Sequence, residues 1–249
     1  MRGSYMWGGE MFKHGPSECR RCWAGPEKDV QEVGAFRLVR DPGHWGASEP
    51  HTLVLGISKG NTQSRAFAAG EFDRVAFKGI RHRMLDLLQS VGLLPGESAG
   101  QFEQRFQRDE ADFAFASVVR CSITGMDRRK GVHTADSPNV IPAFDHRRSG
   151  TEFVRNCVDQ HLVDLPERTR TVLLLGNTDS YVAALSRTIG ERRGRVTTLN
   201  PMAYSSGGVT FVHLAHPSKG NGHFGAYLRG EGKPGLKRDH AKSALAAKN

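Results

Sequence analysis

Four cysteines are the residues of this chain whose type and spacing suggest chemistry most directly. They are Cys19, Cys22, Cys121 and Cys157. Only the first two are close in sequence, in the motif ECRRC, whereas structural zinc sites usually combine two local pairs within one short module. A local pair joined by two isolated cysteines from the body of a fold is more typical of an iron–sulfur cluster held by four thiolates. The spacing therefore favours an iron–sulfur cluster, and zinc or four buried thiols are the alternatives.

The overall composition narrows the classes of protein to consider. The 249 residues carry 35 Lys and Arg against 26 Asp and Glu, a net charge of +9, which favours an anionic partner such as nucleic acid. A basic protein without such a partner is the alternative. No stretch approaches the roughly 18–20 apolar residues of a membrane span, and the first 15 residues lack the apolar run of a signal peptide. Four cysteines without an export signal predict a cytoplasmic protein.

Basic side chains gather in two segments of the chain. The larger group lies between the third and fourth cysteines and comprises Arg120, Arg128, Arg129, Lys130, His133, His146, Arg147 and Arg148. The smaller group comprises Arg192, Arg193 and Arg195. Such clusters are typical of contacts to a phosphate backbone.

The elements that must position these residues follow from the apolar pattern. Short continuous apolar runs, typical of strands buried on both faces, occur at 52–57, 113–119, 171–175 and 209–214. Helical periodicity or capping residues predict helices at 77–91, 152–165 and 178–189. Alternating strands and helices predict a three-layer α/β/α sandwich with a four-stranded, mainly parallel sheet. Ligands bind such sheets at the carboxyl ends of the strands, so we expect the loops there to gather at one edge.

The domain organisation predicted from these patterns has three parts. Residues 1–50 are expected to form an irregular segment tied down by its two cysteines, and residues 51–232 the α/β domain. Within that domain, residues 122–150 are expected to form a long, polar and basic loop. Residues 233–249 are expected to be a short basic helix or a frayed end.

Seven short motifs in order resemble the uracil-DNA glycosylase superfamily, specifically its iron–sulfur branch, family 4. They are the first cysteine pair, GISKG at 56–60, Phe77-Lys78-Gly79, SVVRC at 117–121, Cys157, VLLLG at 172–176 and His216-Pro217-Ser218. Each motif is weak alone, but the set covers most of residues 17–230 in the family's order. The resemblance implies a monomeric DNA repair enzyme with a 4Fe-4S cluster. It would remove uracil or another deaminated or modified base from single- or double-stranded DNA.

The resemblance also implies roles for individual residues. Phe77 would stack on a flipped base, and His216 would stabilise the departing base anion. Ser117 stands where the family reads uracil with Asn, and Ser218 would bind a flanking phosphate. Further substrate contacts are expected at Gly56, Ile57, Lys59, Gly60 and Asn177.

The first motif departs from the family pattern, because GISKG contains no carboxylate, no Asn and no Pro. Ser58 takes the position of Asp or Asn in several branches, and Asn61, Thr62 and Gln63 follow shortly after it. Any of these four could orient a water molecule, but none is a general base at neutral pH. Losing a good general base costs on the order of 100- to 10,000-fold in rate, so we expect a slow or specialised enzyme.

Three alternatives remain open at this point. One is a non-catalytic protein of the same fold that binds uracil or lesion-containing DNA. Another is covalent trapping of the sugar by His133, because Arg128–His133 loosely resembles the basic loop of a branch that reacts in this way; a loop that only contacts phosphates is the simpler interpretation. The third is a pocket for a free nucleoside, against which the basic charge argues.

Overall fold

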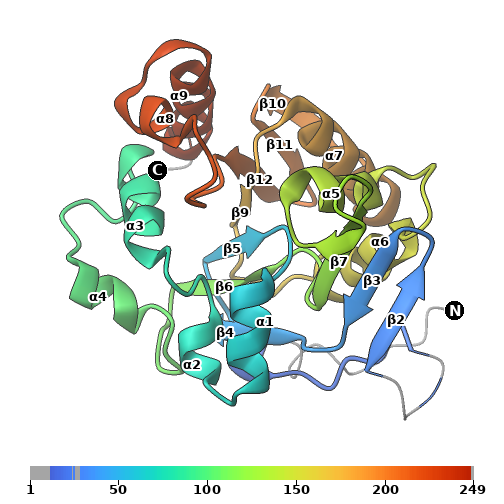
Figure 1. Cartoon of the computed structure of the whole chain (residues 1–249). Coiled ribbons are helices and arrows are strands. Elements are labelled where there is room, and N and C mark those ends of the chain that lie inside the picture. Colours follow the sequence, from blue (N-terminus) through green and yellow to red (C-terminus); the bar gives the residue numbers. More distant parts are fainter. Residues whose placement is uncertain (1–11, 24, 26–28, 248–249) are drawn as a thin grey trace, which may run out of the picture.

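A central mixed sheet organises the molecule (Figure 1). The computed structural model describes residues 12–23, 25 and 29–247. The sheet has eight strands in the order β1-β4-β6-β5-β9-β12-β11-β10. Its four central strands are mutually parallel and are the four that the apolar runs predict: β6 (Phe113–Ser117), β5 (Thr52–Gly56), β9 (Thr171–Leu175) and β12 (Val209–Leu214).

The predicted size of the sheet is wrong, since antiparallel strands extend it at both edges. These strands are β1 (Gly15–Pro16) and β4 (Gly43–Gly46) at one edge, and β11 (Ala203–Ser206) and β10 (Thr197–Asn200) at the other. They are short, and their sequences lack a continuous apolar run. The apolar pattern therefore identified only the strands that are buried on both faces.

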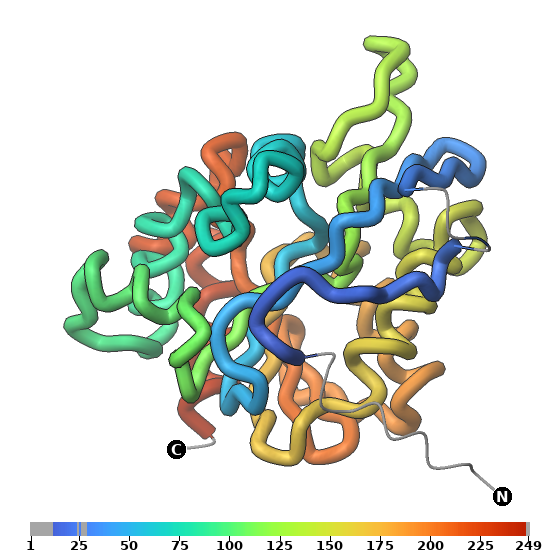
Figure 2. Tube along the Cα trace, turned by 90° about the horizontal axis from the view of Figure 1, so that it is seen from below, coloured from blue at the N-terminus to red at the C-terminus, as the bar shows by residue number. Residues whose placement is uncertain are grey.

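A second, antiparallel sheet contradicts the expected irregular segments. Its order is β2 (Val30–Val33), β3 (Phe36–Val39), β7 (Ser122–Asp127) and β8 (Val132–Thr134). The segment 122–150 is thus not a structureless loop, because it also contains α5 (Ser137–Val140) and the 3-10 helix η1 (Ile141–Phe144). Segment 1–50 likewise contributes four strands among its described residues. In the tube view, the hairpin of β7 and β8, coloured lime green, projects from the body (Figure 2).

Helices cover both faces of the central sheet. On one face, α3 (Arg81–Ser90), α8 (Phe224–Arg229) and α9 (Gly232–Ala246) belong to the core cluster around Val54. On the other face, α6 (Thr151–His161) and α7 (Asp179–Arg193) pack with Leu53 and Leu55. Successive residues of β5 thus face different cores, which explains its continuous apolar sequence. The predicted α/β class is confirmed. The tail 233–249, expected to be a short basic helix or a frayed end, lies mostly in the regular helix α9.

The remaining helices are short and lie between β5 and β6. They are α1 (Asn61–Ala68), α2 (Phe72–Val75) and α4 (Ala99–Gln104). Ser98 caps α4 with a reciprocal capping box to Gln101. In the described part of the chain, no helix is long and apolar enough to cross a membrane.

Candidate active site

The loops that follow β5, β9 and β12 line a cavity of about 490 Å³, here called the strand-end cavity. Four of the predicted site residues lie in its wall: Ile57, Asn177, His216 and Ser218. They come from three separate strand-end loops, as expected for a parallel sheet. The structure also places Asp136, just before α5, in the same wall, although no sequence motif singles it out.

His216 is held as a neutral imidazole with one defined tautomer. Its Nδ1 atom accepts a hydrogen bond from the backbone N–H of Ser218 at 3.1 Å. Burial lowers the pKa of His216 to about 4, so the ring is neutral at neutral pH. Because Nδ1 acts as the acceptor, the proton of the neutral ring is assigned to Nε2. His216 can therefore donate a hydrogen bond from Nε2 to a ligand in the cavity.

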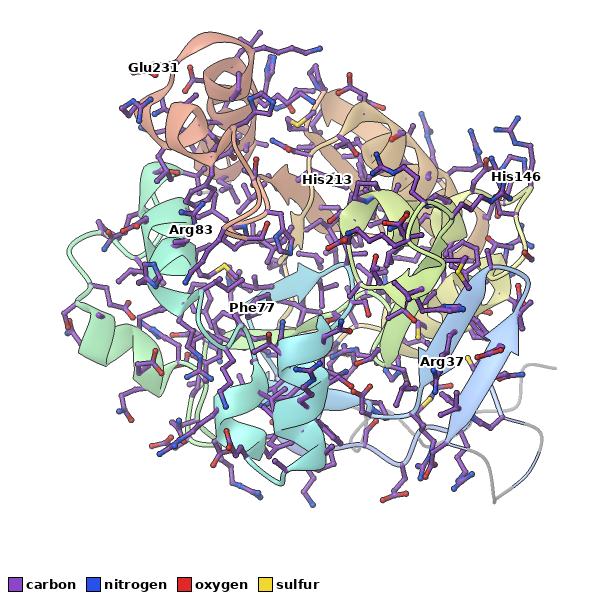
Figure 3. The ribbon with its side chains drawn as sticks, in the orientation of Figure 1. Arg37, Phe77, Arg83, His146, His213 and Glu231 are labelled. Atoms are coloured by element: carbon purple, nitrogen blue, oxygen red, sulfur yellow. The ribbon has the colours of Figure 1, made fainter. Side chains whose placement is uncertain are left out.

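Arg83 fixes the loop that carries His216 (Figure 3). From α3, its Nε donates to the carbonyl of Pro217 at 2.7 Å and its Nη2 to that of Ser218 at 3.2 Å. The guanidinium also lies 4.2 Å from the centre of the Phe224 ring. Arg83 thus ties the His216 loop to α3 and α8. Nothing in its sequence position distinguishes it from the other arginines, so sequence reasoning missed it.

Gly56, Phe77 and Ser117 meet beside the strand-end cavity without lining it. A Cβ atom on Gly56 would lie 3.5 Å from the Phe77 ring and 3.6 Å from the Ser117 hydroxyl oxygen. The Phe77 ring packs against Phe115, with 6.2 Å between ring centres, so it also belongs to the core. Three residues that the resemblance assigns to base recognition are thus brought together.

The backbone of Phe77 is strained. Its φ of 53° lies in the left-handed region, which costs a residue with a side chain roughly 1–2 kcal/mol. The side chain of Gln63 accepts a hydrogen bond from the Phe77 N–H at 3.1 Å and helps to hold this conformation. Such strain is often kept where a side chain must be aimed at a ligand. It also explains why α3 begins at Arg81 rather than at the predicted residue 77.

Ser58 and Lys59 turn away from the strand-end cavity, contrary to their predicted roles. The Ser58 hydroxyl donates to the carbonyl of Cys121 at 3.1 Å and accepts from the N–H of Ile123 at 2.9 Å. Lys59 is 2% exposed, lies 3.4 Å from the Asp41 carboxylate and donates to the carbonyl of Arg120. Both side chains therefore fix the chain after β6 instead of contacting a ligand.

Three further predicted residues lie outside the cavity wall. Gly60 precedes α1 as its N-cap residue, and Asn61 is exposed at the first position of that helix. His133 lies on β8, where its Nδ1 atom is 3.5 Å from the Thr124 hydroxyl. None of the three lines the strand-end cavity.

Three of the four cysteines lie in or against the core cluster that contains Leu53 and Leu55. Cys121 and Cys157 are buried, and Cys22 packs against the same cluster and accepts a hydrogen bond from Asn156 at 3.5 Å. Burial, together with the thiols of Cys22 and Cys19, raises the pKa of Cys157 to about 12. Electrostatic coupling of this kind requires the thiols to lie near one another. Within the described residues, however, no group of three or more His, Cys, Asp or Glu is arranged to hold a single metal ion.

Some buried polar groups beside the cysteines lack partners among the described residues and fit an anionic group. Arg120 is 3% exposed; its Nη1 atom lies 3.3 Å from Nδ1 of His44, but Nε and Nη2 have no hydrogen-bond partner within the described part of the chain. The same holds for both ring nitrogens of His161, which are also buried. Cys157 and Cys19 interact electrostatically with Arg120. A buried guanidinium that interacts with the thiols of Cys157 and Cys19 is compatible with a cluster of negative charge bound by thiolates.

The site residues that sequence reasoning missed have no local signature. Asp136 and Arg83 reach the site only because α5 and α3 pack beside the strand ends. No protein-family model matches the chain, and no curated protein matches it.

Proposed function

We propose that the protein is a DNA glycosylase that removes uracil or another deaminated or modified base by base flipping and hydrolysis of the N-glycosidic bond. The observation that carries the proposal is the neutral His216, held with its Nε2 proton available at the strand-end cavity. The trio of Gly56, Phe77 and Ser117 beside the cavity supports it, as does the resemblance in motif order. The net charge of +9 suits a polyanionic substrate.

In the proposed reaction the bond between the sugar C1′ atom and the base nitrogen breaks, and both electrons leave with the base. Positive charge develops on the sugar and negative charge on a base carbonyl oxygen. His216 donates a hydrogen bond from Nε2 to that oxygen. This hydrogen bond is strongest in the transition state, where the negative charge develops. Water then adds to C1′ and loses one proton, and the base gains one, so the products are an abasic sugar and a neutral free base.

We assign Asp136 the role of holding and deprotonating the attacking water. It contributes the one carboxylate among the described residues that line the strand-end cavity. Its carboxylate forms no hydrogen bond or ion pair with the described residues, and it is exposed. The first motif offers no substitute, since the Ser58 hydroxyl already bonds to Cys121 and Ile123. The Asp136 carboxylate, positioned just before α5, would take the role of the carboxylate that the GISKG motif lacks.

Cys19, Cys22, Cys121 and Cys157 would hold the proposed 4Fe-4S cluster. An iron–sulfur cluster can exchange an electron, but no step of the hydrolysis requires one. Its role here would be to join the first cysteine pair to α6 and to the chain after β6. Zinc is the alternative metal for the same thiols.

Two substitutions test the proposal on oligonucleotides that contain uracil, hypoxanthine or xanthine. His216→Ala should slow base release by roughly 100- to 1,000-fold, as expected for the loss of a donor to a developing anion. Asp136→Asn should slow it by roughly 100- to 10,000-fold. Asp86→Asn is the matched control, because Asp86 is exposed on α3 away from the cavity wall. Base release that is unchanged in both His216→Ala and Asp136→Asn would contradict the proposed chemistry.

A non-catalytic DNA-lesion binder of the same fold is the second candidate. It is favoured by one observation, namely that Ser58 and Lys59 of the first motif serve the fold and not the cavity. Lesion-specific gel shifts without base release would support it. A denaturation-resistant adduct that disappears in His133→Ala would instead support covalent trapping, and base release from free nucleosides would support a nucleoside hydrolase.

A further inference from the structure

A second cavity, here called the basic cavity, lies on the other side of α5. Its volume is about 630 Å³, and Asp136 and Pro138 line both this cavity and the strand-end cavity. The intervening wall is tightly packed, since a Cβ on Gly125 of β7 would lie 1.9 Å from the carbonyl oxygen of Asn139. Only glycine at position 125 therefore allows α5 to rest directly on β7. The two cavities are adjacent and held in a fixed relation.

Cations dominate the lining of the basic cavity. They are Arg128, Arg129, Lys130 and Arg148, against the carboxylates of Asp127 and Asp136. Lys130 lies 3.7 Å from Asp127, which is the one ion pair that these four cations form within the described residues. The guanidinium groups of the three arginines have no ion-pair partner among the described residues, and all three are exposed.

The turn that presents three of these cations is ordered by its own hydrogen bonds. Asp127 accepts bonds from the backbone N–H groups of Arg129 and Lys130 at 2.9 and 3.2 Å. Gly131, with φ of +68°, closes the turn through its N–H to the carbonyl of Asp127 at 2.8 Å. Asp127 thus serves mainly to shape the turn, and the neighbouring arginines remain available to an external anion.

We propose that the basic cavity binds the phosphate backbone on one side of the flipped nucleotide. The inference rests on the proposed function, because the strand-end cavity defines where the flipped base lies. Arginine forks match phosphate oxygens and would position the strand without reading its sequence. Because the basic cavity lies on the far side of α5 from the flipped base, its arginines can contact the DNA backbone on one side of the target nucleotide. The protein would therefore engage its strand asymmetrically about the target base.

The first test measures affinity for a short single-stranded oligonucleotide without any damaged base, as a function of salt concentration. Each phosphate contact to a single strand contributes about 0.7 to the slope of log K against log salt. The triple variant Arg128→Gln, Arg129→Gln, Arg148→Gln should lower that slope by about 2. The corresponding triple Arg→Lys variant keeps the charges and should keep the slope. Arg108→Gln, in the segment between α4 and β6, removes an exposed charge away from both cavities and should leave the slope unchanged.

The second test addresses direction. Two oligonucleotides carry a central uracil, with uncharged methylphosphonate linkages on either the 5′ or the 3′ side. Wild-type protein should lose affinity strongly for only one of them, and the triple Gln variant should no longer distinguish the two. Equal losses on both sides, an unchanged slope in the triple Gln variant, or an equal effect of Arg108→Gln would overturn the inference.

The two proposals fail in different ways. The slope of log K against log salt on undamaged strands does not depend on base release. If no base is released but the triple Gln variant has a lowered slope, only the glycosylase proposal is refuted. If base release responds to His216→Ala but the slope of the triple Gln variant is unchanged, only the proposal for the basic cavity is refuted. Thermal unfolding of each variant verifies that the exposed substitutions leave the fold intact.

Discussion

The cysteine region and the His216 loop at the strand-end cavity differ in how their polar groups are paired. In the cysteine region, here meaning the four cysteines with Arg120, His44 and His161, Nε and Nη2 of Arg120 and both ring nitrogens of His161 have no hydrogen-bond partner among the described residues. In the His216 loop, His216 accepts a hydrogen bond from Ser218, and Arg83 holds the surrounding carbonyls.

This difference is consistent with the two ligands that we propose. Unpaired buried polar groups destabilise a fold by roughly 1–3 kcal/mol each, so a resident anionic group beside Arg120 would stabilise the cysteine region. The His216 loop is held by the chain itself, which suits a ligand that enters and leaves. The proposed cluster in one region and the proposed substrate in the other would account for both patterns.

Among the substitutions that test this difference, replacement of one cysteine should have the largest effect on the stability of the protein. In Cys157→Ser the loss of the proposed cluster would leave Arg120 as an uncompensated buried charge, which should cost roughly 3–5 kcal/mol of unfolding free energy. The measurement is chemical denaturation of anaerobically purified protein, together with its iron and zinc content. Metal-free wild-type protein with the same stability as Cys157→Ser would show that the region has no resident metal.

Replacement of Arg120 should change stability in a direction that reports on the resident anion. If a cluster lies beside it, Arg120→Met removes a counter-charge and should destabilise the protein by roughly 3–5 kcal/mol. If nothing anionic is bound, replacing a buried, unpaired guanidinium by a hydrophobic side chain should stabilise by about 1–4 kcal/mol. We expect destabilisation. An increase in the denaturation midpoint would show that no anionic group is bound beside Arg120.

The pH dependence of stability should reveal the buried neutral histidine beside the strand-end cavity. His213 donates from Nδ1 to the carbonyl of Gly176, and burial lowers its pKa to about 4, against 6.5 in the unfolded chain. Between these values the unfolded chain takes up a proton that the folded protein excludes, so stability falls as the pH falls, by about 1.4 kcal/mol per pH unit. His213→Asn keeps a donor to Gly176 and should lower the slope of unfolding free energy against pH by one proton. An unchanged slope would mean that His213 is already protonated in the fold.

Substitution of Arg83 should have the smallest effect and tests whether the cavity is preorganised. In Arg83→Ala the loop that carries His216 loses its support from α3, and we expect base release to slow by about tenfold, or about 1.4 kcal/mol. The loss should fall on kcat and not on KM, because the positioning of His216 matters most in the transition state. Arg83→Lys should restore part of the rate, and Arg74→Ala, an exposed arginine of α2, should have no effect. A loss confined to KM would place Arg83 in substrate binding.

Several features could be predicted from the sequence because they are local. The four parallel strands have continuous apolar runs, and burial on both faces demands such runs wherever the strands lie. Their carboxyl ends then had to share one edge, so Ile57, Asn177, His216 and Ser218 were correctly expected to gather. The edge strands and the second sheet were missed, because short strands such as β4 and β8 have no distinctive periodicity.

The direction of each side chain could not be predicted in the same way. Ser58 and Lys59 lie in the predicted loop, yet their hydrogen bonds to the chain after β6 turn them from the cavity. Asp136 was overlooked inside a segment expected to be a loop, and packing of α5 on β7 brings it to the cavity wall.

The sequence by itself determined the central parallel strands, the positive charge and the set of four cysteines, because composition and short-range periodicity are properties of the chain. The tertiary structure alone decided that Nε and Nη2 of Arg120 are buried with no hydrogen-bond partner among the described residues, that Arg83 supports the His216 loop, and that α5 separates two cavities. Those features depend on contacts between residues far apart in the chain, and such contacts exist only when the elements pack.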